Sequence, residues 1–247
     1  MKITIFNTEK SDCILIDIDS KFVLIDTALD TTKEYIYNEL MKRNVQQLEC
    51  LILSHHDKDH IGGADKIIDN IKVEKIYMPN YVKPSKDYFE LLKAINDNKL
   101  EPIFLRENKH ININGADITI FPAFKEEYEK SNNYSLIVSI KYGNYKFLFM
   151  GDAQKKRLKE FLSYNKEQFD FVKMPHHGKF NSKTEEFVNN TLPKYALITC
   201  SKVKMPMKET MDCLNKIGTK TFLSLDGQVD IECNKEKFEI KQKNYKK

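Results

Sequence analysis

The feature that most constrains the fold is a pattern that the chain shows twice. Short β-rich runs are followed by alternating apolar strands and amphipathic helices. In the first half the expected strands are 3–6, 13–18, 22–27, 48–54 and 73–79, with helices at 33–44 and 86–98. No Pro-, Gly- or Ser-rich linker and no block of like charge separates the halves. The sequence therefore predicts one α/β (α+β) domain over 1–247, with two central sheets and outer helices.

The second half repeats the pattern with clearer turn signals. Strands are expected within 103–123, with Asn114-Gly115 as a tight turn, and a hairpin over 134–153 turns at Gly143-Asn144. Further on, the sequence predicts helices at 154–169, 183–192 and 207–218, strands at 171–175 and 195–201, and a terminal hairpin over 221–233. The charged tail 239–247 is expected to fray.

Composition excludes several classes of protein. Hydrophobic residues make up 41% and charged residues 31% of the 247, which is typical of a globular chain. No run approaches the roughly 18 consecutive apolar residues that a membrane span needs, so no membrane association is expected. A net charge of +4 does not by itself indicate nucleic acid. A strand starts at Met1, leaving no room for a signal peptide, and the five cysteines are scattered. Together these features favour a cytoplasmic protein with reduced thiols.

Histidine and aspartate cluster directly after the apolar run 48–54. The segment reads Ser-His-His-Asp-Lys-Asp-His-Ile-Gly-Gly from Ser54, and five of the six histidines lie here or in His176-His177. Alternate residues of an extended segment point the same way, so His55 and Asp57 can bind one ion. Asp59 and His60 can reach a second ion at the following turn. These ligand types suit Zn²⁺, Mn²⁺ or Fe. The alternative without a metal is a solvated polar loop that caps a helix.

Two later segments carry further candidates. Asp152 follows Gly151 at the end of the apolar run 145–150, where it is either a site carboxylate or an ordinary helix cap. His176 and His177 follow a short strand and precede Gly178, which suits close backbone approach to a ligand. Taken alone, the paired histidines are equally consistent with surface residues.

Together these segments resemble the metallo-β-lactamase superfamily. The ordered set is Asp26, then SHHDKDHIGG, FLFMGDA and FVKMPHHG, and it spans most of the chain. The branch that it most resembles is typified by the C-terminal domain of the competence protein ComEC and by phosphorylcholine esterases. The resemblance implies an αββα sandwich of two mixed sheets flanked by helices. Two departures stand out: Asp57 replaces a histidine of the wider superfamily, and the loop histidine expected near Asn132 or Asn133 is missing.

The resemblance also implies roles for individual residues and two divalent metal ions, Zn or Mn. His55 and Asp57 would hold one ion, Asp59, His60 and His177 would hold the other, and Asp152 would bridge the two. Asp26 would orient a ligating histidine from behind. Asp59 would accept a proton from the attacking water, and His176 would face the substrate as a phosphate contact or proton donor.

The substrate class implied is a phosphodiester, either a nucleic acid, a nucleotide or a phosphocholine-type ester. Four loop lysines are candidate phosphate contacts, although for any single one an ordinary solvated lysine is the favoured explanation in a Lys-rich chain: Lys83, Lys86, Lys179 and Lys183. Two alternatives stay open. One is a lactonase or thioesterase of the same fold, and the other is a non-catalytic, metal-stabilised binding module. Nothing in the sequence identifies an obligate protein partner.

Overall fold

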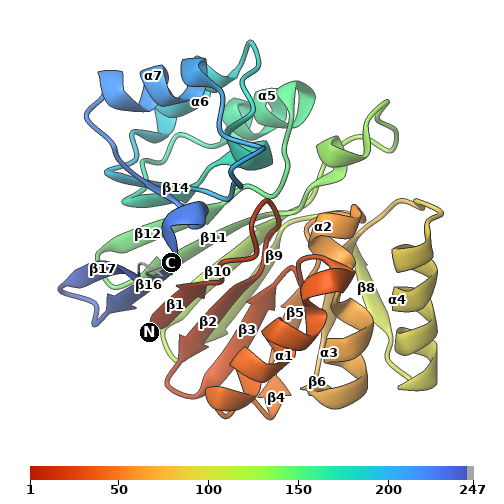
Figure 1. Cartoon of the computed structure of the whole chain (residues 1–247). Coiled ribbons are helices and arrows are strands. Elements are labelled where there is room, and N and C mark those ends of the chain that lie inside the picture. The colour runs from red at the N-terminus through yellow and green to blue at the C-terminus, as the bar shows by residue number, and fades with distance from the viewer. Residues whose placement is uncertain (244–247) are drawn as a thin grey trace.

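The computed structural model describes residues 1–243, and its centre is two β-sheets that lie face to face (Figure 1). The first sheet has eight strands in the order β17-β16-β1-β2-β3-β5-β7-β8. Its strands are β1 (Lys2–Ile5), β2 (Ile14–Ile18), β3 (Lys21–Ile25), β5 (Cys50–Ile52), β7 (Ile76–Pro79), β8 (Pro102–Leu105), β16 (Gln228–Cys233) and β17 (Phe238–Lys243).

The second sheet has seven strands in the order β15-β14-β13-β12-β11-β10-β9. Its strands are β9 (Lys109–Ile113), β10 (Ala116–Phe121), β11 (Ile137–Tyr142), β12 (Tyr145–Phe149), β13 (Phe171–Lys173), β14 (Tyr195–Ile198) and β15 (Lys220–Leu223). A separate parallel pair is formed by β4 (Gln47–Leu48) and β6 (Lys72–Val73). In both large sheets antiparallel hairpins lead into parallel strands, so both are mixed.

Helices cover the outer faces of the two sheets (Figure 1). The helices α1 (Lys33–Lys42), α3 (Ala64–Asn70) and α4 (Lys86–Asp97) pack on the first sheet, and α5 (Lys155–Tyr164), α6 (Thr184–Thr191) and α7 (Lys208–Lys216) pack on the second. Between the sheets, β-branched and aromatic side chains such as Ile3, Ile118 and Phe147 form the central core. The αββα sandwich is therefore confirmed.

Short helical segments link the strands to the loops at one end of the sandwich. They are α2 (Lys58–Ile61), η1 (Asp30–Thr32), η2 (Ser131–Tyr134), η3 (Pro175–Gly178) and η4 (Ser224–Asp226). Within residues 1–243, every helix is too short or too polar to cross a lipid bilayer.

The turn signals placed the hairpins correctly. Strands β2 and β3 pair across Asp19-Ser20, where both residues have positive φ, and β9 and β10 pair across Asn114-Gly115. Strands β11 and β12 pair across Gly143, which also has positive φ.

Three expectations near the C-terminal end of the sequence are wrong. The segment 221–233 is not a hairpin, because β15 extends the second sheet beside β14 whereas β16 crosses to the first sheet and pairs with β1. Residues 239–243 do not fray, because they belong to β17, which pairs with β16 along its whole length; residues 244–247 of the expected tail lie outside the described part. The helix expected over 154–169 ends at Tyr164, because Asn165 takes an extended conformation.

Candidate metal centre

The candidate residues gather where several strands end. Strand β3 leads into Asp26, β5 into the segment from His55 to His60, β12 into Asp152, and β13 into His176 and His177. Strands β3 and β5 run parallel in one sheet, and β12 and β13 run parallel in the other. Because parallel strands share one carboxyl edge, each sheet brings its candidates to the same end of the sandwich.

Four ligand atoms meet at this edge. They belong to Asp59, His60, Asp152 and His177 and lie within 4.8 Å of one another. Asp152 Oδ1 is 3.3 Å from both His60 Nε2 and His177 Nε2, and His177 Nε2 is 3.4 Å from Asp59 Oδ2. We call these four residues the core group. Neighbouring ligand atoms around a tetrahedral ion with bonds of about 2.0–2.1 Å are about 3.3–3.4 Å apart, so this spacing fits a bound divalent ion.

The two core histidines are held by hydrogen bonds behind them. His60 Nδ1 lies 2.7 Å from Asp26 Oδ2, and His177 Nδ1 lies 2.8 Å from Thr199 Oγ1. Asp26 is itself fixed by the backbone N–H and the hydroxyl of Ser54, both at 2.7 Å. With Nδ1 engaged, each ring presents Nε2 to the centre, as metal-ligating histidines do.

Three atoms of the core group are buried and lack a hydrogen-bond partner among the described residues: His60 Nε2, Asp152 Oδ1 and His177 Nε2. Buried polar atoms are nearly always paired, because leaving one unpaired costs about 1–3 kcal/mol. Three such atoms converging on one point indicate a missing partner that can accept all three lone pairs. A divalent cation has this property.

The charges of the core group are strongly coupled. Burial raises the pKa of Asp152, but the neighbouring His177 and His60 outweigh burial and hold that pKa well below its usual value. Burial lowers the pKa values of His60 and His177, but the surrounding carboxylates, of which Asp152 has the largest effect, together outweigh burial and raise both pKa values. Without a metal ion, protons on the imidazoles balance the carboxylates. A divalent ion would displace those protons.

A second acidic group behind the centre already contains a cation. Asp12, Asp26 and His60 bring ligand atoms within 4.8 Å of one another, but the Lys173 ammonium contacts Asp12 Oδ2 directly. Burial raises the pKa of Asp12, but the charges of Lys173, His60 and His177 together outweigh it and keep that pKa below its usual value. Asp12 Oδ1 also accepts a hydrogen bond from Thr199, at 2.7 Å. This group therefore supports His177 from behind.

His55 and Asp57 lie beside the core group but face other partners. His55 Nε2 is 3.8 Å from Asp57 Oδ1 and 3.4 Å from Asn132 Nδ2. The Lys83 ammonium contacts Asp57 Oδ1, and Ser131 donates to the same oxygen at 3.0 Å. Burial lowers the pKa of His55 to about 3, so its ring is neutral at pH 7 and carries a free lone pair.

His56 points away from the centre, as the alternation of residues 55, 57 and 59 predicts. Its ring stacks on Tyr81 with centroids 4.4 Å apart, and its backbone N–H donates to the Tyr81 hydroxyl at 2.7 Å. Tyr81 stacks in turn on Tyr134 at 4.1 Å. The tyrosines near the motifs are thus packing residues that brace the loop.

A basic pocket opens beside the core group. It has a volume of about 330 Å³, and it is lined by Lys10, His176, His177, Lys179, Lys204, Met205 and Met207. Lys10 also reaches Asp59, with Nζ 3.3 Å from Oδ2. Burial lowers the pKa of His176 to about 4, so this ring is neutral at pH 7, and its Nε2 lies 3.8 Å from Asp152 Oδ2.

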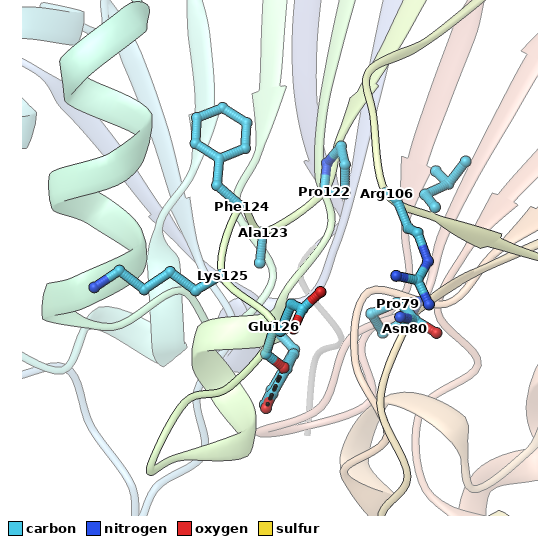
Figure 2. A pocket seen from close by; sticks show the side chains of 10 residues that line it. Pro79, Asn80, Arg106, Pro122, Ala123, Phe124, Lys125 and Glu126 are labelled. Carbon is cyan, nitrogen blue, oxygen red and sulfur yellow. Dashed lines mark hydrogen bonds between the residues drawn. The ribbon is translucent and has the colours of Figure 1, made fainter.

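A second pocket of about 240 Å³ has Tyr134 among its lining residues. Figure 2 shows it from close by. The loop 122–126 forms one side, and Pro79, Asn80 and Arg106 form the other. It contains none of the candidate site residues. The stack of Tyr134, Tyr81 and His56 connects it to the loop that carries Asp57.

The sequence located most of this centre. The structure brings Asp59, His60, Asp152 and His177 together, puts Asp26 behind His60, and puts His55, Asp57 and His176 at the rim. It does not bring His110 near, because that residue is exposed on β9. Sequence reasoning missed Lys173 and Thr199, although a lysine within the apolar run Phe171–Met174 was a usable signal.

An αββα sandwich with a buried His/Asp centre at its strand ends defines a class of metal-dependent hydrolases. The chain belongs to the metallo-beta-lactamase superfamily, whose family model matches residues 7–201. Two curated relatives are competence proteins. ComE operon protein 3 of Bacillus subtilis is 27% identical over 66% of this chain and 21% of its own length. Competence protein ComA of Neisseria gonorrhoeae is 24% identical over 79% of this chain and 26% of its own length. These relatives confirm the ComEC-like branch.

Solved structures confirm the fold. Tm1679, a metal-dependent hydrolase of the beta-lactamase superfamily, superposes with a TM-score of 0.64 at 14% identity, over 94% of this chain and 99% of its own. A diphosphatase from the PhnP family superposes with a TM-score of 0.55 at 13% identity, over 93% of this chain and 97% of its own. The chain spans about a fifth to a quarter of the length of the curated relatives that it matches.

Proposed function

We propose that the chain is a metal-dependent hydrolase of phosphodiesters. The observation that carries this proposal is the convergence of His60 Nε2, Asp152 Oδ1 and His177 Nε2, buried and without a partner among the described residues. A scaffold that bound no ion would have to keep two buried imidazoles protonated around Asp152 at this point, whereas a divalent ion satisfies all three atoms at once. Membership of a superfamily whose members are usually hydrolases supports the same reading.

Some residues of this chain would bind the ion, and others would fix the orientation of its ligands. Asp59, His60, Asp152 and His177 would hold the ion, with Asp26 and Thr199 fixing the two rings. A divalent ion bound there supplies an activated water at neutral pH and stabilises the charge that develops on the scissile ester.

Asp59 and His176 are the candidate catalytic side chains. The pKa of Asp59 is below its usual value, because the His177 ring and the His60 charge outweigh the effect of burial. Asp59 is therefore ionised at pH 7 and can accept the proton of the attacking water. His176 is neutral and lines the basic pocket, where its ring can donate a hydrogen bond to a substrate oxygen.

The charge around the pocket favours an anionic substrate. Lys10, Lys179 and Lys204 line it together with His176. Ammonium groups around a concave site attract phosphate groups and raise the rate of encounter. A lactone or thioester carries no charge at its reacting group and gains little from these lysines. Competence relatives and a diphosphatase with the same fold are consistent with a nucleic-acid or nucleotide phosphodiester, cleaved with Mn²⁺ or Zn²⁺.

The test is a substrate panel run with each metal. Bis-p-nitrophenyl phosphate, single-stranded and duplex DNA, a lactone and a thioester are incubated with Mn²⁺ or Zn²⁺. We expect turnover of the phosphodiesters, and loss of at least ~100-fold in Asp152→Asn, because that variant removes charge from the ion site. The control is Asp117→Asn, which changes an exposed aspartate on β10.

Preferential hydrolysis of the lactone or thioester would refute the phosphodiester assignment. Metal binding with no turnover of any substrate would favour the binding module. Full activity in Asp152→Asn would show that the core group is not the reaction centre.

A further inference from the structure

The two oxygens of Asp152 face different surroundings. Oδ1 points at His60 and His177 and lacks a hydrogen-bond donor among residues 1–243. Oδ2 lies 3.3 Å from Asn132 Nδ2, which donates to it. Oδ1 therefore faces the two imidazoles with no donor in the described part of the chain, whereas Oδ2 faces an N–H donor. The Oδ2 side is where the superfamily resemblance implies a second ion.

Asp57, the first ligand expected for that second ion, is already neutralised. The Lys83 ammonium contacts Asp57 Oδ1, and it lies 3.2 Å from Ser131 Oγ. Ser131 in turn donates to Asp57 Oδ1 at 3.0 Å. The carboxylate, the ammonium and the hydroxyl form a closed triangle. A metal ion at Asp57 would have to displace the lysine or lie against its positive charge.

His55, the second ligand expected there, also has a donor in front of it. Its Nε2 lies 3.4 Å from Asn132 Nδ2, the same amide nitrogen that faces Asp152. Gln154 Nε2 donates to Asn132 Oδ1 at 3.3 Å, which turns the amide nitrogen toward the centre. An amide nitrogen cannot ligate a cation, because it has no available lone pair. Asn132 thus blocks the second ion position on the side of His55 and Asp152.

We propose that the centre holds one divalent ion, in the core group, and that Lys83 and Asn132 take the place of the second ion. This inference rests on the proposed function and departs from the pair of ions that the resemblance implies. The Lys83 ammonium supplies a fixed positive charge on the side of Asp57, where it can contact a substrate phosphate without a metal.

The charges at this position support the assignment. Replacing the superfamily histidine by Asp57 adds a negative charge, which alone would strengthen cation binding. Lys83 cancels that charge and leaves the position neutral. The chain uses the same arrangement behind the centre, where Lys173 neutralises Asp12. In both places a lysine fills a carboxylate site that a metal ion would otherwise occupy.

Metal stoichiometry tests the proposal without reference to turnover. Chelator-stripped protein is titrated with Mn²⁺ by calorimetry, and the loaded protein is examined by electron paramagnetic resonance. We expect one ion per chain in the wild type, with the resonance of an isolated Mn²⁺. Lys83→Met combined with Asn132→His removes the ammonium and adds an imidazole, so this variant should bind two ions with an exchange-coupled signal.

The matched control is Lys86→Met, which removes an exposed lysine of the same region that pairs with Asp30. This control should bind one ion, and circular dichroism should show that both variants are folded. Two ions of similar affinity in the wild type would overturn the proposal. A single ion in the folded Lys83→Met/Asn132→His variant would overturn it as well.

The outcome is separable from that of the proposed function. Hydrolysis with two ions in the wild type would refute this inference and leave the function intact. A single bound ion with no hydrolysis of any substrate would uphold the inference about the site and refute the phosphodiesterase.

Discussion

Replacing Lys173 by methionine should destabilise the protein strongly. Lys173 is the last residue of β13, within the apolar run 171–174, and its side chain is 0% exposed against 2% for its partner Asp12. Methionine nearly keeps the volume but removes the charge. Buried Asp12, which lies near Asp26 and Asp152, then loses its direct ion-pair partner and keeps only the more distant His60 and His177. Breaking a buried ion pair from one side costs about 3–5 kcal/mol in the free energy of unfolding.

The double variant Lys173→Met/Asp12→Asn separates charge from packing. Asparagine keeps an oxygen for the Thr199 hydroxyl, which donates to Asp12 Oδ1 at 2.7 Å in the wild type. With both charges removed, the loss should shrink to about 1–2 kcal/mol, the cost of imperfect hydrogen bonding alone. Urea unfolding at pH 7 in the presence of a chelator measures both values without a contribution from metal binding.

The effect should also depend on pH in a defined way. The pKa of Asp12 lies below its usual value, because the charges of Lys173, His60 and His177 together outweigh burial. Its contribution to stability is therefore present above the unfolded pKa of about 3.9 and lost as pH falls through the lower folded pKa. The Lys173 pKa is raised, because Asp12 and Asp152 outweigh burial, so its contribution is present below about 10.4 and lost above the raised folded pKa. Lys173→Met removes the largest of the charges that lower the Asp12 pKa, so this pKa should rise in the variant. The difference in the free energy of unfolding between wild type and Lys173→Met should therefore be greatest near neutral pH and shrink toward acid pH, where the variant protonates Asp12 and removes the unpaired charge. A loss under about 1 kcal/mol, or a double variant no more stable than the single one, would refute the reasoning.

Two further predictions concern the core group and the turn that carries it. Mn²⁺ at 100 times its dissociation constant at pH 7 should stabilise the stripped protein by about 2.7 kcal/mol, measured by thermal unfolding. The raised pKa values of His60 and His177 stabilise the metal-free protein below about pH 6.5, and this contribution is lost as pH rises through the folded values. With the Mn²⁺ concentration held fixed, the gain should therefore increase with pH, and a gain independent of pH would contradict proton displacement. Gly178→Ala should lower the free energy of unfolding by about 1–3 kcal/mol and weaken Mn²⁺ binding. The reason is that Gly178 has φ +72° and a Cβ there would lie 2.8 Å from Pro206 Cβ. Wild-type stability and Mn²⁺ affinity in this variant would show that the turn is not constrained.

The sequence predicted the layers of the fold well, because periodic patterns and turn residues are local signals. The hairpins at Asn114-Gly115 and Gly143 follow from backbone conformations that these residues favour. The path of 221–233 was wrong for the opposite reason. Strand β16 is placed by pairing with β1, more than 220 residues away. The short link 224–227 between β15 and β16 gives no local sign that the chain changes sheets.

The site shows the same division between local and distant information. His55, Asp57, Asp59 and His60 were recognisable because they crowd into one loop. Thr199 reaches His177 only because β14 pairs with β13. The residues next to Thr199 in the sequence do not indicate this pairing. The partnership of Lys83 with Asp57 likewise depends on how the loop after β7 packs against the loop after β5.

Ala28 adopts a backbone conformation that is uncommon for residues other than glycine. Its φ is +59°, a value that glycine adopts without strain. The backbone is held there by hydrogen bonds from Ala28 N–H to the Asp12 carbonyl and from Gly62 N–H to the Ala28 carbonyl.

The four core ligands come from both sheets in equal number. Asp59 and His60 follow β5 of the first sheet, whereas Asp152 and His177 follow β12 and β13 of the second. An ion at this position would therefore be a cross-link between the two layers, joining residues that are 92 to 118 positions apart in the chain. Neither sheet alone supplies more than two of the four ligands, so tight binding requires that the two sheets pack against each other. Removing the ion should therefore weaken the packing between the sheets before either sheet unfolds.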